Sequence, residues 1–321
     1  MTTIINLIVT CTKKKTRVVP ESLHLRDLNT SSCDDRIKEW IGRLDQADEE
    51  RETVRDLYSG DHWSVARSLH GLQRSNFKVR TWVASAGCGL LGIDEEVQPY
   101  SATFSKNHLD SVVKYDVAAS EWWSQLTKQR GWSVKALAEK EPHSLILLAA
   151  STTYLRAMRQ DIVDAAEVLE TKDHLSIVSA GTRTLDGLDG HLLPCDARMR
   201  SSVGGALRSL NARVAKKVLE GTNGLPLYSH LKTWLQEDLD RQPDLVSFGR
   251  TPMENSEIRE YVITAITENP GITHSRLLRQ FRDDGNACEQ GRFRDLFLEV
   301  AGKLKRELMA SEVPGVLSEE E

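Results

Sequence analysis

Four short polar segments carry the side chains with the clearest chemical potential. They are Thr10-Cys11-Thr12-Lys13-Lys14-Lys15, Ser85-Ala86-Gly87-Cys88-Gly89, Ser151-Thr152-Thr153 and Ser179-Ala180-Gly181. Each lies at the end of a short apolar run of the sequence. Small hydroxyl, thiol and glycine residues let a ligand approach the backbone and offer hydrogen bonds without bulk. The segments therefore predict a ligand site if the fold brings them together.

Three residues in or near these segments could act on a substrate directly, namely Cys11, Lys13 and Asp196. Cys11 is the best-placed nucleophile, because the positive charges of Lys13 and Lys14 favour a thiolate. Asp196 is the best candidate for a general base, because a carboxylate can activate water beside Arg198. Two alternatives stay open. The lysines can form a solvated edge, and Asp196 can simply pair with Arg198 or cap the following turn.

The ligand-binding candidates combine hydroxyl groups, glycines, cations and two aromatic rings. They are Thr12, Lys14, Trp63, Ser85, Gly87, Tyr100, Ser101, Thr103, Ser179, Gly181 and Arg198. Tyr100 and Trp63 could stack on a flat heterocycle, as aromatic rings commonly do with bases. Hydroxyl groups of Ser85, Ser101 or Thr103 could then bond the edge of that heterocycle. The alternative is that Tyr100 is a turn residue that packs on the core.

Several familiar catalytic patterns do not occur in the sequence. Pro194-Cys195-Asp196 lacks the second cysteine of a zinc-deaminase pattern. No H-E-x-x-H or G-x-x-x-x-G-K-[ST] string is present, so zinc-protease and P-loop hypotheses have no support. The five cysteines show no C-x-x-C spacing, which suits reduced thiols better than a disulfide frame. We predict no metal site, and the sequence leaves the cofactor undetermined.

Short apolar runs alternate with longer amphipathic segments through the larger part of the chain. The runs lie at 4–10, 79–85, 145–150 and 175–179, and the amphipathic segments include 36–44, 153–169 and a stretch from about 206 to 219. Runs that are nearly continuous in apolar residues are typical of parallel strands buried on both faces. The alternation predicts an α/β fold, with a mostly parallel sheet and helices on both faces. Ligands of such sheets bind beyond the carboxyl ends of the strands.

Four motifs follow one another in the first third of the chain. They are VTCTKKK at 9–15, LYSGDHW at 57–63, WVASAGCGLL at 82–91 and PYSAT at 99–103. In this order they resemble a poorly characterised bacterial and phage domain family with the pattern S-C-x-K-K, L-Y-x-S-x-x-F, L-S-A-x-x-G-L-L and P-Y-x-x-T. Its members are similar to the nucleobase-handling domains of archaeosine synthesis and to the uracil-DNA-glycosylase-like fold. The resemblance implies a base or nucleotide ligand. Thr10 and Trp63 depart from the pattern, and residues 122–235 have no counterpart in it.

The C-terminal part of the chain predicts three helices. Residues 254–268 place apolar side chains on one helical face, Thr273 can cap a second helix, and residues 293–304 have the spacing of a third. Two helices joined by a tight turn make a helix-turn-helix arrangement. The string from Ile266 to Leu278 resembles the first two helices of winged-helix DNA-binding domains. Little sequence follows Leu308, so the β-wing of those domains has little room.

Six side chains of this module are candidates for contacts with nucleic acid. They are Arg276, Arg279, Arg282, Gln290, Arg292 and Arg294. The whole chain has 42 basic and 47 acidic residues and a net charge of −5. This charge excludes a basic protein that coats nucleic acid non-specifically. Residues 272–306 nevertheless carry eight basic and five acidic side chains. DNA is the expected partner rather than RNA, and the alternative is a module that docks on a protein.

These patterns define the expected organisation and function. An α/β base- or nucleotide-handling domain at 1–240 is followed by a linker at 241–253, a helix-turn-helix module at 254–310 and an acidic tail at 311–321. No apolar run reaches the roughly 18 residues of a membrane span, so we expect a cytoplasmic protein with no membrane partner. The leading hypothesis is an enzyme that acts on a base or nucleotide of nucleic acid, in DNA modification or phage defence. The alternative is a non-catalytic regulator that binds a nucleotide-like small molecule and DNA.

Overall fold

The computed structural model describes residues 2–28, 30, 32–48, 50–114, 117–245 and 249–311. The chain divides into two compact units, Met1–Leu245 and Val246–Glu321. Residues 312–321, which make up almost all of the expected acidic tail, lie outside the described residues. No helix in the described ranges is long and apolar enough to cross a membrane.

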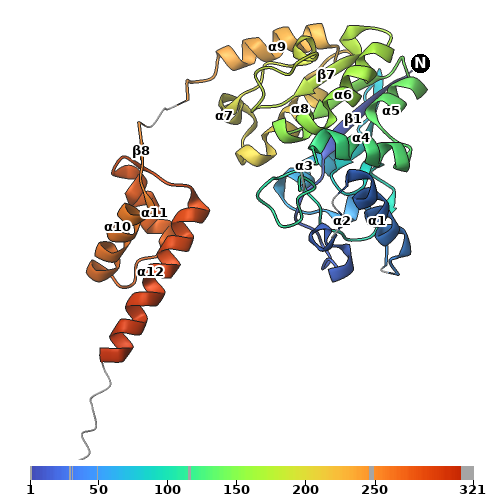
Figure 1. Ribbon diagram of the computed structural model, residues 1–321. Helices are drawn as coiled ribbons and strands as arrows, with labels where there is room; N and C mark the ends of the chain where they lie inside the picture. The colour runs from blue at the N-terminus through green and yellow to red at the C-terminus, as the bar shows by residue number, and fades with distance from the viewer. Residues whose placement is uncertain are drawn as a thin grey trace, which may run out of the picture. The chain divides into compact units, whose positions relative to one another are not determined.

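The larger unit, shown in Figure 1, contains a five-stranded sheet in the order β4-β3-β1-β6-β7. Its strands are β1 (Thr3–Thr10), β3 (Phe77–Ser85), β4 (Gly89–Gly92), β6 (Leu145–Ala149) and β7 (Leu175–Val178). The pairs β1–β3, β1–β6 and β6–β7 are parallel, and β4 runs antiparallel to β3. The predicted α/β fold with a mostly parallel sheet is confirmed. The antiparallel edge strand β4 was not expected.

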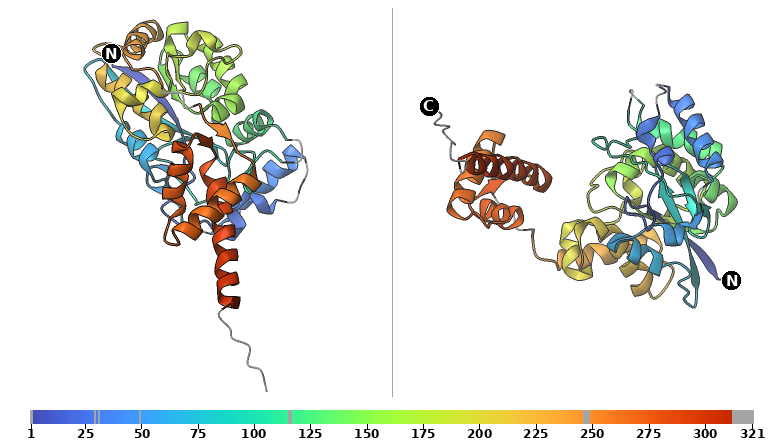
Figure 2. Two further views of the ribbon diagram at one scale, coloured as in Figure 1. Left: turned by 90° about the vertical axis from the view of Figure 1, so that its left-hand side faces the viewer. Right: turned by 90° about the horizontal axis from the view of Figure 1, so that it is seen from below.

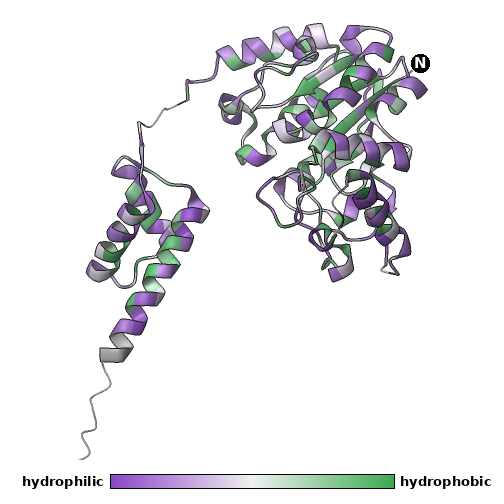
Figure 3. Ribbon diagram, in the orientation of Figure 1, coloured by the Kyte–Doolittle hydropathy of each residue, from purple (hydrophilic) through white to green (hydrophobic). Residues whose placement is uncertain are grey.

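Burial along the strands explains why the sequence forms this sheet. Residues 5–9 of β1 are buried without interruption, and so is every residue of β6 and β7. Because successive side chains of a strand point to opposite faces, both faces of the sheet must be covered. The strands accordingly form a hydrophobic centre, with hydrophilic residues on the surrounding helices (Figure 3).

Helices of the larger unit fall into two groups by their contacts with one another. The helices are α1 (Cys33–Gln46), α2 (Val54–Leu57), α3 (Asp61–Ser68), α4 (Ala119–Arg130), α5 (Val134–Lys140), α6 (Thr152–Val168), α7 (Arg200–Val203), α8 (Leu210–Gly221) and α9 (Tyr228–Asp240). One group packs α1 and α5 around α4 and α6, and the other joins α3 and α7 to α8. A small ladder pairs β2 (Glu52–Thr53) with β5 (Glu96–Val97). Figure 2 shows these elements from two further sides.

In the residues that the structure describes, the smaller unit has three helices and a short strand pair. In chain order these are β8 (Thr251–Pro252), α10 (Asn255–Glu268), α11 (His274–Asp283), β9 (Asn286–Ala287) and α12 (Gln290–Ser311). Thr273 caps α11 by accepting a hydrogen bond from the Arg276 N–H, as the sequence predicted. Ile258, Phe281 and Phe293 are fully buried at the centre of its core. The strands β8 and β9 were not expected, and they pair in parallel.

Two tryptophans hold the turn that follows β3. The indole N–H of Trp40 donates to the Gly87 carbonyl at 2.6 Å, and that of Trp122 donates to the Ala86 carbonyl at 2.7 Å. Both indoles are fully buried. The ring of Tyr100 lies against Gly87 so closely that an added Cβ would meet two of its ring carbons at 2.5 and 2.7 Å. The turn therefore requires glycine at position 87 for reasons of space.

Replacing Gly87 by alanine should push the Tyr100 ring out of its place. We expect Gly87→Ala to lower the free energy of unfolding by about 1–3 kcal/mol, the usual cost of overpacking a core. Gly42→Ala in α1 is the matched control, because a Cβ added there would have no other atom within 4 Å. That change should be neutral or stabilise by up to about 1 kcal/mol. Urea unfolding of both variants measures the difference, and equal changes would contradict the close packing.

Candidate functional site at the switch point of the sheet

The strand order of the sheet reverses between β1 and β6. The connection after β1 leads to β3 on one side, whereas the connection after β6 leads to β7 on the other. Ligands of open α/β sheets bind beyond the carboxyl ends of the strands at such a switch point. Cys11, directly after β1, and Tyr154, in the first turn of α6, meet there with the thiol 3.2 Å from the phenol oxygen.

Lys15 lies beside two tyrosine rings at the same end of the sheet. Its backbone forms an antiparallel bridge with Tyr58, which holds the loop after β1 against the segment after α2. The Lys15 Nζ is 4.7 Å from the centre of the Tyr100 ring and 5.5 Å from that of Tyr58. Burial lowers the pKa of Lys15, and the negative charge of Asp110 is among the effects that oppose this shift. Lys13 and Lys14, by contrast, are exposed.

A chain of hydroxyl groups runs from the turn after β3 to Tyr58. Ser85 Oγ accepts hydrogen bonds from the N–H groups of Gly87 and Cys88, both at 3.1 Å. The Tyr100 hydroxyl bonds both Ser85 Oγ and the Tyr58 hydroxyl. Because the two lone pairs of Ser85 are used, its proton must go to Tyr100, and the Tyr100 proton then goes to Tyr58. The hydroxyl proton of Tyr58 is therefore not used within this chain of hydrogen bonds.

The protonation of these groups follows from their burial. Burial raises the pKa of Tyr58 and of Tyr100 well above the usual value, so both phenols stay protonated. It also raises the pKa of Cys88 to about 11, which keeps this thiol neutral near pH 7. His62 contacts the Thr10 carbonyl through Nε2 at 3.0 Å, and burial lowers the pKa of its imidazole. The chain of hydroxyls is therefore a neutral hydrogen-bond donor.

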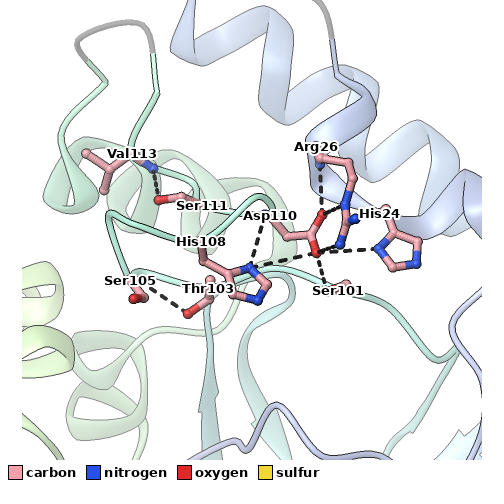
Figure 4. Close-up of polar contacts among 9 residues, drawn as sticks. All are labelled: His24, Arg26, Ser101, Thr103, Ser105, His108, Asp110, Ser111 and Val113. Carbon is pink, nitrogen blue, oxygen red and sulfur yellow. Dashed lines mark hydrogen bonds and ion pairs between the residues drawn. The ribbon is translucent and has the colours of Figure 1, made fainter. Parts of the chain in front are cut away.

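A buried carboxylate, Asp110, organises the loops on one flank of this site (Figure 4). Arg26 donates to it from Nε at 2.7 Å, from Nη2 at 2.6 Å and from its backbone N–H at 3.1 Å. Ser101 donates at 2.7 Å, and a ring nitrogen of His24 lies 3.4 Å away. Burial alone would raise the pKa of Asp110, but these hydrogen bonds outweigh it and hold the pKa well below the usual range.

His108 joins the Asp110 cluster to the exposed lysines. Its Nδ1 accepts a hydrogen bond from the Asp110 backbone N–H at 3.1 Å, so the proton of the neutral ring lies on Nε2. Burial lowers the pKa of His108, and the positive charge of Lys13 lowers it further. His108 is therefore a neutral imidazole near pH 7.

A second group of hydroxyls lies after β6 and β7. Ser179 and Thr152 each contact the Thr182 hydroxyl at 2.8 Å. Asn211 of α8 links the two strand ends, because its amide donates to the Ala150 carbonyl and accepts from the Ala180 N–H. Thr152 and Tyr154 both belong to the first turn of α6, so this turn connects the second group to Cys11.

Most of the predicted ligand-binding residues of the first third of the chain are placed around these clusters. Ser101 donates to Asp110, Thr103 accepts from the Ser105 N–H at 3.2 Å, and Thr12 donates to the Ser59 carbonyl at 3.1 Å. Trp63 is only 1% exposed, with its indole N–H bonded to the Arg55 carbonyl. Tyr100 is equally buried. Neither ring has a face open for stacking, and both pack on the core. For Tyr100 this agrees with the alternative interpretation from the sequence.

Near the strand ends of β6 and β7, the predicted Ser179 belongs to the second hydroxyl group. Gly181 lies close to it, since a Cβ there would come within 3.2 Å of the Thr152 hydroxyl. The predicted base Asp196 instead pairs with Arg198 at 2.9 Å and accepts its backbone N–H at 2.8 Å, which caps the short 3-10 helix Ala197–Met199. Arg198 also lies 3.9 Å from Asp244. These contacts favour the interpretation of Asp196 as a capping residue.

Several residues of the site were not among the predicted ones, and they include Lys15, Tyr58, Asp110, Tyr154 and Asn211. Lys15 and Tyr58 stand inside the motifs at 9–15 and 57–63, so the motifs already contained this signal. Asp110 and Asn211 carried no sequence signal, because their main partners are distant in the chain. Arg26 lies 84 positions from Asp110, and the backbone groups that Asn211 bonds lie 31 and 61 positions from it.

A sizeable cavity lies at the opposite end of the sheet. Its volume is about 590 Å³, and its lining includes Ile4 near the start of β1 together with His70, Lys78 and Thr81. It is thus separate from the carboxyl ends of the strands. In the described part of the chain, no group of three or more His, Cys, Asp or Glu residues is placed to hold a metal ion.

The predicted nucleic-acid contacts of the smaller unit divide into two kinds. Arg276, Arg279, Gln290 and Arg294 are exposed. Arg292 instead donates to the Asn255 side chain at 2.7 Å and to the Met253 carbonyl at 2.9 Å, and Arg282 donates to the Cys288 carbonyl at 2.9 Å. These two guanidinium groups stabilise the unit itself, because they join α12 and α11 to the strand segments.

Asp110→Asn should destabilise the larger unit in a pH-dependent way. The amide cannot accept all the bonds from Arg26 and Ser101, so we expect a loss of about 1.5–3 kcal/mol at pH 7, as for hydrogen bonds to charged groups. A lowered pKa gives stability that is present above the unfolded value near 3.9 and is lost as the pH falls through the folded value. The gap between wild type and variant should therefore shrink below about pH 4. Urea unfolding from pH 7 to 2.5 measures it, and a constant gap would contradict the assignment.

No family model matches the chain, and no curated protein sequence matches it. The functional interpretation therefore depends on the side chains that the fold gathers around Cys11 and Lys15 at the switch point of the sheet.

Proposed function

We propose that the larger unit is an enzyme that acts on a base or nucleotide of nucleic acid. The observation that carries this proposal is the gathering of Cys11, Lys15, Tyr58 and Tyr154 at the switch point between β1 and β6. Open α/β sheets bind their ligands there. The resemblance of the motifs at 9–15, 57–63, 82–91 and 99–103 to nucleobase-handling domains points to the same class of ligand.

The chemistry of the site suits a nucleotide better than an apolar ligand. Lys13 and Lys14 are exposed cations at the rim, and they can bind phosphate groups. Tyr58 ends a chain of neutral hydroxyls and can donate its proton to a carbonyl or ring nitrogen of a base. Such a donor can assist cleavage of a glycosidic bond or modification of the base, because proton transfer to the reacting group lowers the barrier. A setting in DNA modification or phage defence is part of this proposal.

The smaller unit is proposed to bind DNA as a helix-turn-helix module. Helices α11 and α12 come after the tight turn between α10 and α11. Exposed side chains at the start of α12 include Gln290 and Arg294. In a helix-turn-helix, the first residues of the second helix contact the bases. Arg276 and Arg279, exposed on α11, can contact phosphates. Docking on a protein is the alternative for this unit.

A second candidate function is a regulator that binds a nucleotide without converting it. Tyr58, Tyr100 and Ser85 form one buried network, and such a network can be rigid enough for binding alone. This regulator would be stabilised against heat by its nucleotide, because a ligand of the folded state raises its stability. It would release no product from any nucleotide or oligonucleotide.

The first test measures release or conversion of bases. Purified protein is incubated with nucleotides and with single- and double-stranded oligonucleotides, and products are separated by chromatography. We expect Lys15→Met and Tyr58→Phe to reduce turnover at least about a hundredfold, the usual size of a lost acid–base or charge contribution. Lys38→Met, which removes an exposed lysine of α1, is the control and should keep full activity.

Asp196→Ala separates the two interpretations of that residue in the same assay. A capping residue can be removed with little change in turnover and a loss of about 1 kcal/mol in stability. Removal of a general base should instead reduce turnover strongly. A ligand-induced rise in melting temperature without any product, in the wild type and in all variants, would favour the regulator over the enzyme.

The second test concerns the smaller unit and uses DNA binding at several salt concentrations. Arg294→Ala should weaken binding by about 1–3 kcal/mol if this guanidinium contacts a base or phosphate. Arg259→Ala is the matched control, because Arg259 pairs with Glu299 at 3.0 Å on the first helix of the unit. Arg292→Ala should lower the stability of the unit instead, since it removes two internal hydrogen bonds. Equal binding by all three variants would exclude this face as the DNA contact.

A further inference from the structure

We propose that the Lys15 amine is a nucleophile that forms an imine with the aldehyde of a ring-opened pentose. The choice of a sugar aldehyde rests on the proposed function, because removal of a base leaves a sugar that can open to its aldehyde form. The reactivity of Lys15 does not rest on it, and it follows from the surroundings of this one amine.

The first observation is that none of the carboxylates in the described residues lies at bonding distance from the Lys15 Nζ. Within the described residues its close contacts are the faces of the Tyr100 and Tyr58 rings, at 4.7 and 5.5 Å. Ring faces attract a cation weakly compared with water or a carboxylate. Among the groups that oppose the lowering of the Lys15 pKa, the thiols of Cys11 and Cys88 come before the carboxylate of Asp110, which is saturated by Arg26 and Ser101.

The second observation is the contrast among three consecutive lysines. Lys13 and Lys14 are exposed, so their ammonium groups are hydrated, whereas Lys15 turns back onto the tyrosines. Desolvation disfavours the charged form of an amine, which raises the share of the neutral, nucleophilic form at a given pH. Burial lowers the pKa of Lys15 in keeping with this. The three positions therefore offer one nucleophile and two phosphate-binding cations.

The reaction balances without an oxidant or reductant. The neutral amine adds to the carbonyl carbon through its lone pair, and the carbonyl oxygen takes up a proton. Loss of that oxygen as water, together with the remaining proton on nitrogen, leaves a carbon–nitrogen double bond. The Tyr58 ring lies beside this amine, with its centre 5.5 Å from Nζ, and its hydroxyl at the end of the chain from Ser85 is the neutral donor that we assign to this step. Tyr58 is thus a positioning and proton-donating group for the step.

A small aldehyde tests the reactivity of Lys15 independently of any nucleic acid. The full-length protein is treated with limiting propionaldehyde and sodium cyanoborohydride at pH 7, and tandem mass spectrometry locates the alkylated lysines. We expect Lys15 to be modified several-fold faster than Lys13 and Lys14, and the lead to disappear at pH 10, where a larger share of all three amines is neutral. Modification of Lys15 at the rate of its neighbours, or slower, would overturn the proposal.

A sugar aldehyde tests the substrate class. The protein is mixed with an oligonucleotide that contains one abasic deoxyribose, and borohydride is added to reduce any imine to a stable amine. We expect a covalent adduct that is lost in Lys15→Arg and retained in Lys38→Arg, which changes an exposed lysine of α1 outside the site. Both variants keep the positive charge. Circular dichroism and urea unfolding check that Lys15→Arg is folded. An adduct that survives Lys15→Arg would contradict the assignment.

The two proposals can fail separately. Release of a base from intact nucleic acid without a trapped adduct would leave the proposed enzyme standing and remove the imine. An adduct at Lys15 with abasic deoxyribose, but no release of a base from intact nucleic acid, would support the imine and contradict the proposed enzyme. Tyr58→Phe should slow trapping without abolishing it, because water can replace the phenol as a proton donor.

Discussion

The contact between Tyr100 and Gly87 is the constraint on which the site depends. The ring occupies the space where any other residue at position 87 would place its Cβ. In this position the Tyr100 hydroxyl reaches both Ser85 and Tyr58, and its ring supports the Lys15 amine. Trp40 and Trp122 hold the same turn from the helical layer. Segments that are distant in sequence are thereby fixed by one close approach of a ring to a backbone.

The site combines many neutral groups with few charges. Tyr58, Tyr100 and Cys88 remain protonated because burial raises their pKa values. His62 and His108 remain neutral because burial lowers their pKa values. Asp110 keeps its charge but is surrounded by donors. The protonation of these groups near pH 7 is therefore set by burial and by hydrogen bonds within the fold.

The strands and the strand-end location of the site could be predicted from sequence, because continuous apolar runs and the residues that follow them are local signals. Which of the residues near the strand ends form the site could not be predicted from sequence. Lys13, Lys14 and Lys15 are identical in type, and only the bridge to Tyr58 decides that Lys15 is the one turned inward. For Asp196 the sequence left a general base and a partner of Arg198 equally open, and it is the fold that pairs it with Arg198. Asp110 and Asn211 act across long separations, which no local pattern contains. The edge strand β4 was missed because its four residues include two glycines.

The central place of β1 also has a consequence for how the protein folds. This strand precedes its partners β3 and β6 in the chain, and its pairing with β6 joins residues about 140 positions apart. Contacts of such separation form late, because closing long loops costs entropy before the contacts repay it. Until then an apolar, β-branched strand has two unpaired edges and can pair with other chains. Synthesis conditions that slow the appearance of β6 should therefore favour aggregation over assembly of the site.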